Sequence, residues 1–232
     1  MRGCELTRKD RRLSSGLVLL DRLLQGGLVR GRITEVIACG FGWTSLAAAF
    51  VAAVTRCGEA AAWIDSADAF DPASMAMAGI DLERVLWVAA DGASISTPLE
   101  HGAGSSPRAR QRWTTCQAAE LVLNTCGFGL VVIDLSGRNY PLAPSAALRL
   151  AHQAERNGTA VIVAIPQPMG GTFAALSLAV TCIDMFFTRS AVGGPVTFDG
   201  FALEVTVTRN KLGPSGQRAV IKACAALPAP AG

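Results

Sequence analysis

A glycine-rich segment that joins a strand pattern to a helix pattern carries the clearest chemistry in this chain. Residues 35–47 read EVIACGFGWTSLA. This segment resembles the phosphate-binding loop G-x-x-x-x-G-K-[ST], in which backbone N–H groups surround phosphates and a lysine reaches the outer ones. Ala38 replaces the first glycine, the loop is one residue short, and Trp43 replaces the lysine. The residues of the motif that remain are Gly40, Gly42, Thr44 and Ser45.

The missing lysine removes the charge that holds a nucleotide. Backbone N–H groups at a helix start still attract an anion. Each charge-assisted contact that is lost costs about 1.5 to 3 kcal/mol, so we expect nucleotide affinity to fall by about two orders of magnitude or more. The loop therefore predicts a chain that is not an enzyme, with no cofactor and with ATP and Mg²⁺ bound weakly at most.

Trp43 has two possible roles at the lysine position: it either fills the vacated pocket or forms part of a partner surface. We favour filling, because burial of an indole is favourable without any partner.

Asp134 closes a second motif, GLVVID at residues 129–134. An aspartate at the end of such a strand normally orients Mg²⁺ and its waters. A strand-end aspartate also caps the following turn, and without the lysine we favour this structural role. The same reasoning assigns Asp65 and Asp68 to capping and turn chemistry.

Elements that would position these residues follow from the apolar pattern. Strand patterns occupy 33–38, 60–65, 85–88, 130–134, 159–165 and 182–188, and helix patterns occupy 44–56, about 111–124 and 145–157. Their alternation predicts an α/β fold with a mostly parallel sheet and helices on both faces. Residues 202–209 and 217–223 alternate around a turn and predict a C-terminal antiparallel hairpin.

Length and composition predict one core at residues 13–225, after a basic N-terminal segment at 1–12 and before a disordered tail at 226–232. Residues 91–110 lack periodicity and predict a mobile loop. The N-terminus has no apolar signal region, and the two long uncharged stretches are interrupted by glycine or proline, so we expect a cytoplasmic protein without membrane contact. The seven widely spaced cysteines predict reduced, mostly buried thiols and no metal site.

Taken in order, residues 13–35, 62–72, 78–86, 129–134 and 207–212 resemble the RecA recombinase core, over residues 13–223. The resemblance implies a RecA-like P-loop fold. It also implies a glutamate that acts on the hydrolytic water two residues after Asp65, where this chain has Ala67. Gln167 matches the glutamine that links the nucleotide site to a DNA-binding loop. Both DNA loops are shortened, and Arg138 is the only basic residue left in either.

Residues 207–212, VTRNKL, resemble the strand whose two basic residues reach the ATP phosphates of a neighbouring subunit. Arg209 and Lys211 keep that pattern although this chain's own loop is degenerate. They therefore suggest a chain that presents cations to the intact site of a RecA partner. A solvated hairpin edge explains the two residues equally well, and both readings stay open.

Among RecA relatives, three features are most similar to ImuA-type accessory proteins of SOS mutagenesis: the short termini, the segment FGLVVIDL at residues 128–135 and the degenerate loop. That resemblance implies a role in translesion synthesis, with three partners: RecA, an inactive Y-family polymerase-like mutasome subunit, and an error-prone replicative polymerase. The first hypothesis is therefore a non-catalytic accessory protein that acts through protein contacts.

Two other functions remain. The first is DNA binding, with affinity that falls steeply with salt; the net charge of +3 is too small to indicate it alone. Its candidate contacts are Arg8, Lys9, Arg11, Arg12, Arg108, Arg110, Arg112 and Arg138. The second is weak ATPase activity with a lysine supplied from elsewhere in the chain, which the loss of both lysine and glutamate makes the weakest case.

Overall fold

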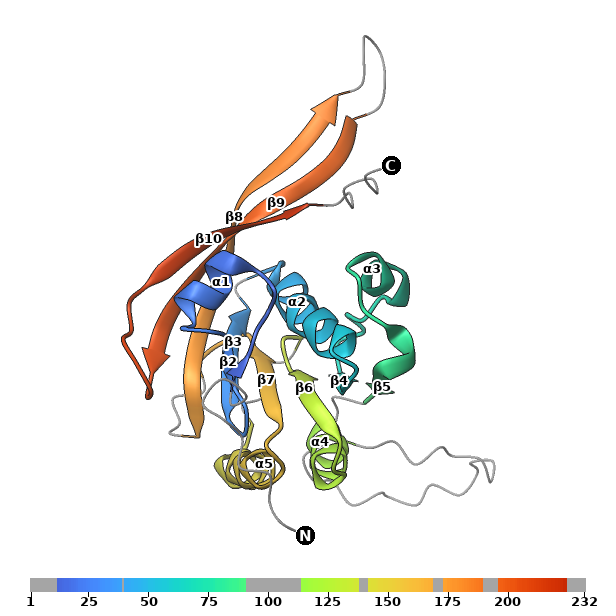
Figure 1. Cartoon of the computed structure of the whole chain (residues 1–232), viewed down its shortest axis with the longest axis vertical. Coiled ribbons are helices and arrows are strands. Elements are labelled where there is room, and N and C mark those ends of the chain that lie inside the picture. The colour runs from blue at the N-terminus through green and yellow to red at the C-terminus, as the bar shows by residue number, and fades with distance from the viewer. Residues whose placement is uncertain are drawn as a thin grey trace, which may run out of the picture.

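The computed structural model describes residues 12–38, 40–90, 114–137, 142–168, 173–189 and 196–224. One eight-stranded sheet organises them, in the order β10-β9-β8-β3-β7-β6-β4-β5 (Figure 1). From β8 to β5 the neighbouring strands are parallel, whereas β9 is antiparallel to both β8 and β10. The α/β fold predicted from the sequence is therefore confirmed, including the antiparallel C-terminal strands. The strands are β3 (Ile33–Ala38), β4 (Ala60–Asp65), β5 (Val85–Ala89), β6 (Phe128–Asp134), β7 (Ala160–Ile165), β8 (Ala174–Arg189), β9 (Val196–Asn210) and β10 (Arg218–Cys224).

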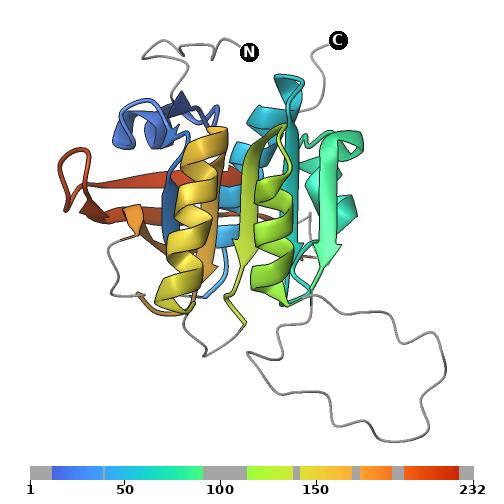
Figure 2. The same ribbon diagram turned by 90° about the horizontal axis from the view of Figure 1, so that it is seen from below.

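Helices cover both faces of this sheet. On one face, α2 (Trp43–Arg56) packs in a core with residues of α1 (Val18–Leu23) and α3 (Pro72–Met77). On the other face, α4 (Thr115–Asn124) and α5 (Pro144–Asn157) lie side by side over a second core (Figure 2). Parallel strands covered in this way are apolar on both faces, and every residue of β7 is buried.

Short elements complete the described chain. The two-residue strands β1 (Arg12–Leu13) and β2 (Leu28–Val29) pair antiparallel on either side of α1. A 3-10 turn, η1 (Leu82–Arg84), leads into β5. None of these elements, nor α1 or α3, was expected from periodicity, because each is too short to carry a period of its own.

The strands β8 and β9 form a long arm. They have 16 and 15 residues, and β8 pairs with β3 only as far as Val180. Beyond that point the two strands pair with each other and project away from the parallel sheet (Figure 1, orange). The sequence patterns at 182–188 and 202–209 marked only parts of these strands, so the extent of the hairpin is a correction.

Other details also differ from expectation. The fourth helix begins at Thr115, with Thr114 and Gln117 forming a capping box, rather than near residue 111. Among the cysteines whose surroundings are described, Cys57 and Cys126 are exposed and Cys116 and Cys182 are half-buried, so the expected burial of the thiols was wrong. No helix in the described ranges is long and apolar enough to cross a membrane. The loop at 91–110 and the tail at 226–232 lie outside the described residues.

Candidate functional site

The degenerate loop leads directly from β3 into α2. Gly42 is the N-cap of α2 and has a φ of 102°, a left-handed conformation that favours glycine. A Cβ atom added there would lie 2.4 Å from Cδ2 of Leu203, so β9 packs closely against the loop. Gly40 also has a left-handed φ, of 101°. Cys39 lies outside the described residues, so an N–H nest around an anion stays a prediction.

Trp43, at the lysine position, is part of the core. Its side chain is 4% exposed and stacks on Trp63 of β4, with ring centroids 5.9 Å apart. Trp63 in turn packs on Phe70 at 5.3 Å, and Phe70 on Trp87 at 5.2 Å. A row of aromatic rings therefore begins at the position where a phosphate-binding loop has its cation. Trp43, Trp63 and Phe70 are buried and Trp87 at the end of the row is 43% exposed, so Trp43 is part of the core rather than of a partner surface.

Asp134 lies at the end of β6 and is fully buried, with 0% exposure. Its Oδ1 accepts hydrogen bonds from the Ser136 backbone N–H at 2.8 Å and from Ser136 Oγ at 2.7 Å. Its Oδ2 has no hydrogen-bond partner among the described residues. Burial raises the pKa of Asp134 above its ordinary value, and the charge of Asp65 adds to this, although the Ser136 hydrogen bonds oppose it. A carboxylate without solvent access is poorly placed to hold hydrated Mg²⁺.

Asp65 stabilises the turn that follows β4. Its two oxygens accept from the backbone N–H groups of Ala69 and Phe70 at 3.0 and 3.1 Å, and Oδ2 also accepts from Trp87 Nε1 at 3.3 Å. The capping role predicted for Asp65 is confirmed. Asp68 is exposed in the same turn, with a φ of 56°. Asp68 thus comes one residue after Ala67, the position of the family's glutamate, and its left-handed backbone belongs to the turn rather than to a strand end.

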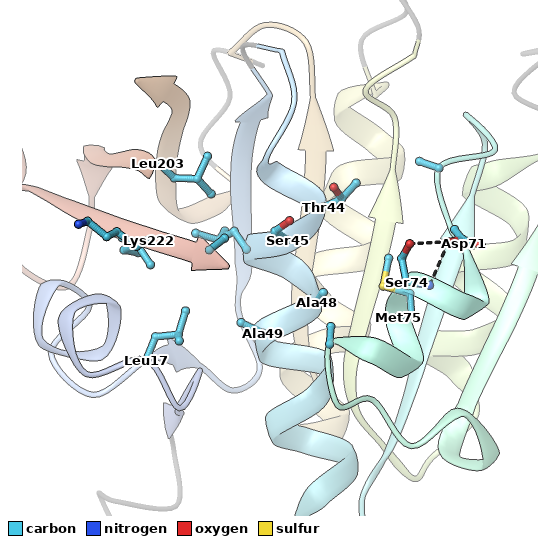
Figure 3. A pocket seen from close by; sticks show the side chains of 15 residues that line it. Leu17, Thr44, Ser45, Ala48, Ala49, Asp71, Ser74, Met75, Leu203 and Lys222 are labelled. Carbon is cyan, nitrogen blue, oxygen red and sulfur yellow. Dashed lines mark hydrogen bonds between the residues drawn. The ribbon is translucent and has the colours of Figure 1, made fainter. Parts of the chain in front are cut away.

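A cavity of about 540 Å³ opens over the outer face of α2 (Figure 3). Ser45, Ala48 and Ala49 form its floor, and β10 and α1 border it on one side and α3 on the other. Thr44, Asp71 and Ser74 add polar groups, but Asp71 already accepts from the Ser74 N–H at 2.9 Å. The cavity is large enough for a small ligand.

Lys222 is the cation among the residues that line this cavity. Figure 3 shows its side chain extending away from Thr44 and Ser45. Its Nζ lies 5.4 Å from the ring centroid of Phe186, over the face of the ring. Lys222 therefore does not replace the missing loop lysine. Without a cation directed at Thr44 and Ser45, the residues that line the cavity do not fit the phosphates of a nucleoside triphosphate.

Arg209 and Lys211 lie at the opposite end of the sheet from the loop. Arg209 pairs with Ser177 of β8, and Ser177 pairs with Glu35 of β3. The Lys211 N–H donates to the carbonyl of Ala175, close to the start of β3. Because β3 spans six residues, Lys211 lies roughly 20 Å from the loop along the strand direction, whereas Arg209 is level with Glu35 near the middle of β3. The half-buried Arg209 is engaged within the chain and is not simply a solvated edge residue.

The arm carries an aromatic row that sequence reasoning missed. Phe41 of the loop contacts Phe201 at 6.3 Å, Phe201 stacks on Phe198 at 6.1 Å, and Phe198 contacts Phe187 at 5.5 Å. Phe41, Phe187 and Phe198 are 54, 57 and 40% exposed. Each looks like a core residue in the sequence. The pairing of β8 with β9 places Phe187 and Phe198 outside the core, and ring contacts through Phe201 link them to the exposed Phe41.

Among the remaining candidates, Gln167 is exposed just beyond β7. Arg12 donates to the carbonyls of Leu24 and Gly27 at 2.7 and 3.1 Å. Its guanidinium therefore links β1 to the turn before β2 and is less available to contact DNA. No group of three or more potential metal ligands occurs in the described ranges. The candidate DNA contacts that lie outside them are Arg8, Lys9, Arg11, Arg108, Arg110, Arg112 and Arg138.

Comparison with known proteins finds relatives of part of the chain. Residues 3–97 match the RecA N-terminal domain family. Protein RecA of Arthrospira platensis is 40% identical over 75 residues, which are 32% of this chain and 20% of that protein. The chloroplastic DNA repair protein recA homolog 1 of Arabidopsis thaliana is 39% identical over 74 residues, 32% of this chain and 17% of that protein. The matched stretch thus spans a fifth or less of these two relatives.

A solved structure extends the likeness to most of the chain. The crystal structure of the RadB recombinase superposes with a TM-score of 0.60 at 18% identity, covering 90% of this chain and 95% of that one. Residues 3–97 are thus similar to the RecA N-terminal domain, and the chain has the fold of a RecA-like recombinase.

Proposed function

We propose that this chain is a non-catalytic RecA-like accessory protein of ImuA type. It would act in the cytoplasm in damage-induced (SOS) translesion mutagenesis, through contacts with RecA or with mutagenic polymerase subunits. One observation carries the proposal: the cation position of the nucleotide loop is occupied by the buried Trp43, which stacks on Trp63, whereas Arg209 and Lys211 lie away from that loop.

The first support comes from what phosphoryl transfer requires. Its catalysis depends on positioning and on positive charge around the phosphates. Here Trp43 replaces the lysine, Asp134 is buried, and Ala67 stands where the family has its glutamate. Each change alone weakens an ATPase, and the three together favour a chain that has lost the reaction but kept the fold.

The second support comes from the surfaces that remain for partners. Arg209 and Lys211 lie away from the chain's own loop, so a phosphate bound at that loop is not the anion that they would contact. The aromatic row of the arm adds an exposed apolar surface, of the kind that marks protein interaction sites. The inactive polymerase-like subunit and the error-prone polymerase are candidate partners for that surface.

DNA binding is the second candidate, but the described residues favour it less. Arg12 is engaged with backbone carbonyls, and the arm carries Asp184, Asp199 and Glu204, which phosphates would repel.

RecA's own ATPase provides the test. The chain is added to RecA on single-stranded DNA, and turnover is compared for the wild type and for the double variant Arg209→Gln, Lys211→Gln. We expect the wild type to change RecA turnover and the double variant to lose most of that effect. Arg84→Gln is the matched control, because Arg84 is an exposed arginine beside β5, at the other edge of the sheet.

Two results would count against the proposal. If the wild-type chain neither changes RecA turnover nor binds a polymerase subunit, the accessory role is wrong. If the isolated chain hydrolyses ATP, the weak ATPase gains the support that the present geometry does not give it.

A further inference from the structure

Along the arm, one edge of β8 has no neighbouring strand within the described ranges. β8 pairs with β3 as far as Val180 and with β9 as far as Arg189, so its β3 side is unpaired beyond Val180 (Figure 1). The register of β8 on β9 shifts at Ile183, which is the extra residue in β8, and again at Asp199, which is the extra residue in β9. Residues 184–189 of β8 therefore form an uninterrupted edge.

This edge has an apolar face. Successive side chains of a strand point to opposite faces, so Met185 and Phe187 share one face. Their register partners on β9 are Phe201 and Phe198, and the rings of Phe187 and Phe198 are 5.5 Å apart. Met185 and Phe187 remain 47 and 57% exposed. An added strand would therefore find apolar neighbours on this face.

The opposite face of the edge is polar. Asp184, Phe186 and Thr188 alternate with the apolar residues. Lys222 of β10 lies over the ring of Phe186, with Nζ 5.4 Å from the centroid, and the Thr188 hydroxyl donates to Asp199. Antiparallel sheets commonly have one apolar and one solvated face, and the apolar one is normally covered.

One charge at each end of residues 184–189 indicates what could cover it. Arg189 follows Phe187 on the apolar face and forms no ion pair within the described ranges. Asp184 begins the polar face, and its Oδ1 accepts from the Met185 N–H at 2.9 Å. Residues directly opposite in neighbouring strands lie about 5 Å apart at Cβ. A matching strand thus carries an acid opposite Arg189, a base opposite Asp184 and apolar residues opposite Met185 and Phe187.

We propose that residues 184–189 bind an extended segment of a partner protein, which adds an antiparallel strand to the arm. From its amino end, this segment reads acidic, polar, apolar, polar, apolar, basic. In such strand addition, main-chain hydrogen bonds give affinity and alternate side chains give specificity. β8 has no lysine or proline at this edge to block pairing. The inference rests on the proposed function, since it gives the mode in which the arm contacts a mutagenic polymerase subunit.

The test uses the full chain and the end-blocked peptide Glu-Thr-Ile-Thr-Ile-Lys, followed by fluorescence anisotropy. We expect binding by the wild type and about fivefold weaker binding by Arg189→Glu and by Phe187→Thr. A peptide that begins with Lys instead of Glu should restore binding to Arg189→Glu. Arg218→Glu is the matched control, because Arg218 is an exposed arginine on β10, at the other edge of the sheet, and this variant should bind like the wild type.

Two further peptides separate strand addition from simple apolar contact. One is N-methylated at its first, third and fifth residues, and the other at its second, fourth and sixth. In a strand, alternate N–H groups point to opposite sides, so only one of the two peptides loses its hydrogen bonds to β8. That peptide should bind at least tenfold more weakly, and the other should bind like the parent peptide.

Four outcomes would overturn the site. They are no binding by the wild type, no rescue of Arg189→Glu by the exchanged charge, equal binding of the two methylated peptides, and dimerisation of the chain that Phe187→Thr abolishes. The last result would assign the edge to a second copy. Circular dichroism confirms that each variant is folded. RecA and polymerase subunits are absent here, so a failure of this site is distinct from a failure of the accessory role, which the RecA turnover assay detects.

Discussion

The two ends of the parallel sheet have opposite chemistry in this chain. At the carboxyl ends of β3, β4 and β6, the residues that would handle a nucleotide are buried among aromatic rings or in a turn. At the amino end of β3, Arg32 and Lys211 are exposed and Arg209 is half-buried. The strands between the two ends keep the buried, parallel pairing of a RecA-like core. The two ends of β3 therefore differ in kind, with buried aromatic packing at one end and exposed cations at the other.

The largest expected effect comes from restoring the lysine. Trp43→Lys removes the stack on Trp63 and places an ammonium group in an apolar site, so the free energy of unfolding should fall by about 3 to 5 kcal/mol. ATP binding should not return, because Asp134 remains buried. Denaturant unfolding and ATP titration measure the two effects.

Trp43→Phe is the control for this variant, since it keeps an aromatic ring at the position and should lose much less stability. A stable Trp43→Lys protein that binds ATP with micromolar affinity would contradict the description of the loop end as core.

A smaller effect is expected from the exposed aromatic row. Replacing Phe187 and Phe198 together by serine removes one aromatic pair at the surface, which contributes about 0.5 to 1.5 kcal/mol. Thermal unfolding should therefore change slightly, whereas binding to a polymerase subunit should weaken if the arm is the contact surface. A loss of stability as large as that of Trp43→Lys would mean that the arm is core rather than surface.

Asp134→Asn should raise the stability of the protein, whereas the variants above lower it. Because the folded-state pKa of Asp134 is raised, the native protein binds the proton more tightly, and stability falls as pH rises from the ordinary value of 3.8 through the folded pKa. At neutral pH the asparagine avoids ionisation in a buried site, and we expect a Tm about 2 to 4 °C higher.

The pH dependence is the check on this prediction. Below pH 3.8 the wild type is protonated in both states, so the advantage of the asparagine should disappear there. A variant less stable than the wild type at neutral pH would mean that the carboxylate is used in the ionised form.

The smallest effect is expected at Lys211. Slight desolvation of the exposed amine, followed by the charges of Arg209 and Arg32, lowers the pKa of Lys211, so removing its charge should cost no stability. We expect Lys211→Gln to leave Tm unchanged or raise it by up to about 2 °C. A clear loss of stability would show that the amine has a structural partner.

Much of the fold could be predicted because buried parallel strands are continuous apolar runs. β3 and β4 begin and end at the predicted residues, and β7 is one residue shorter. The arm could not be predicted in full, because Phe187 and Phe198 imitate core residues in a strand pair that has no helix over it. Periodicity describes one element, whereas exposure depends on what packs against that element.

The candidate site was predictable where it lies in one local motif. The loop at 40–45 and the strand-end Asp134 follow from sequence, and so does the absence of the lysine. The stack of Trp43 on Trp63 requires strand order and register, which join residues from separate elements of the chain.

Titration of the isolated chain with ATP and Mg²⁺ at low salt compares the two ends most directly, using the wild type, Thr44→Val at the loop and Lys211→Gln at the opposite end. We expect weak binding by the wild type, unchanged binding by Thr44→Val, and about fivefold weaker binding by Lys211→Gln. Binding that Thr44→Val abolishes and Lys211→Gln leaves intact would contradict this, because the nucleotide would then still bind at the loop.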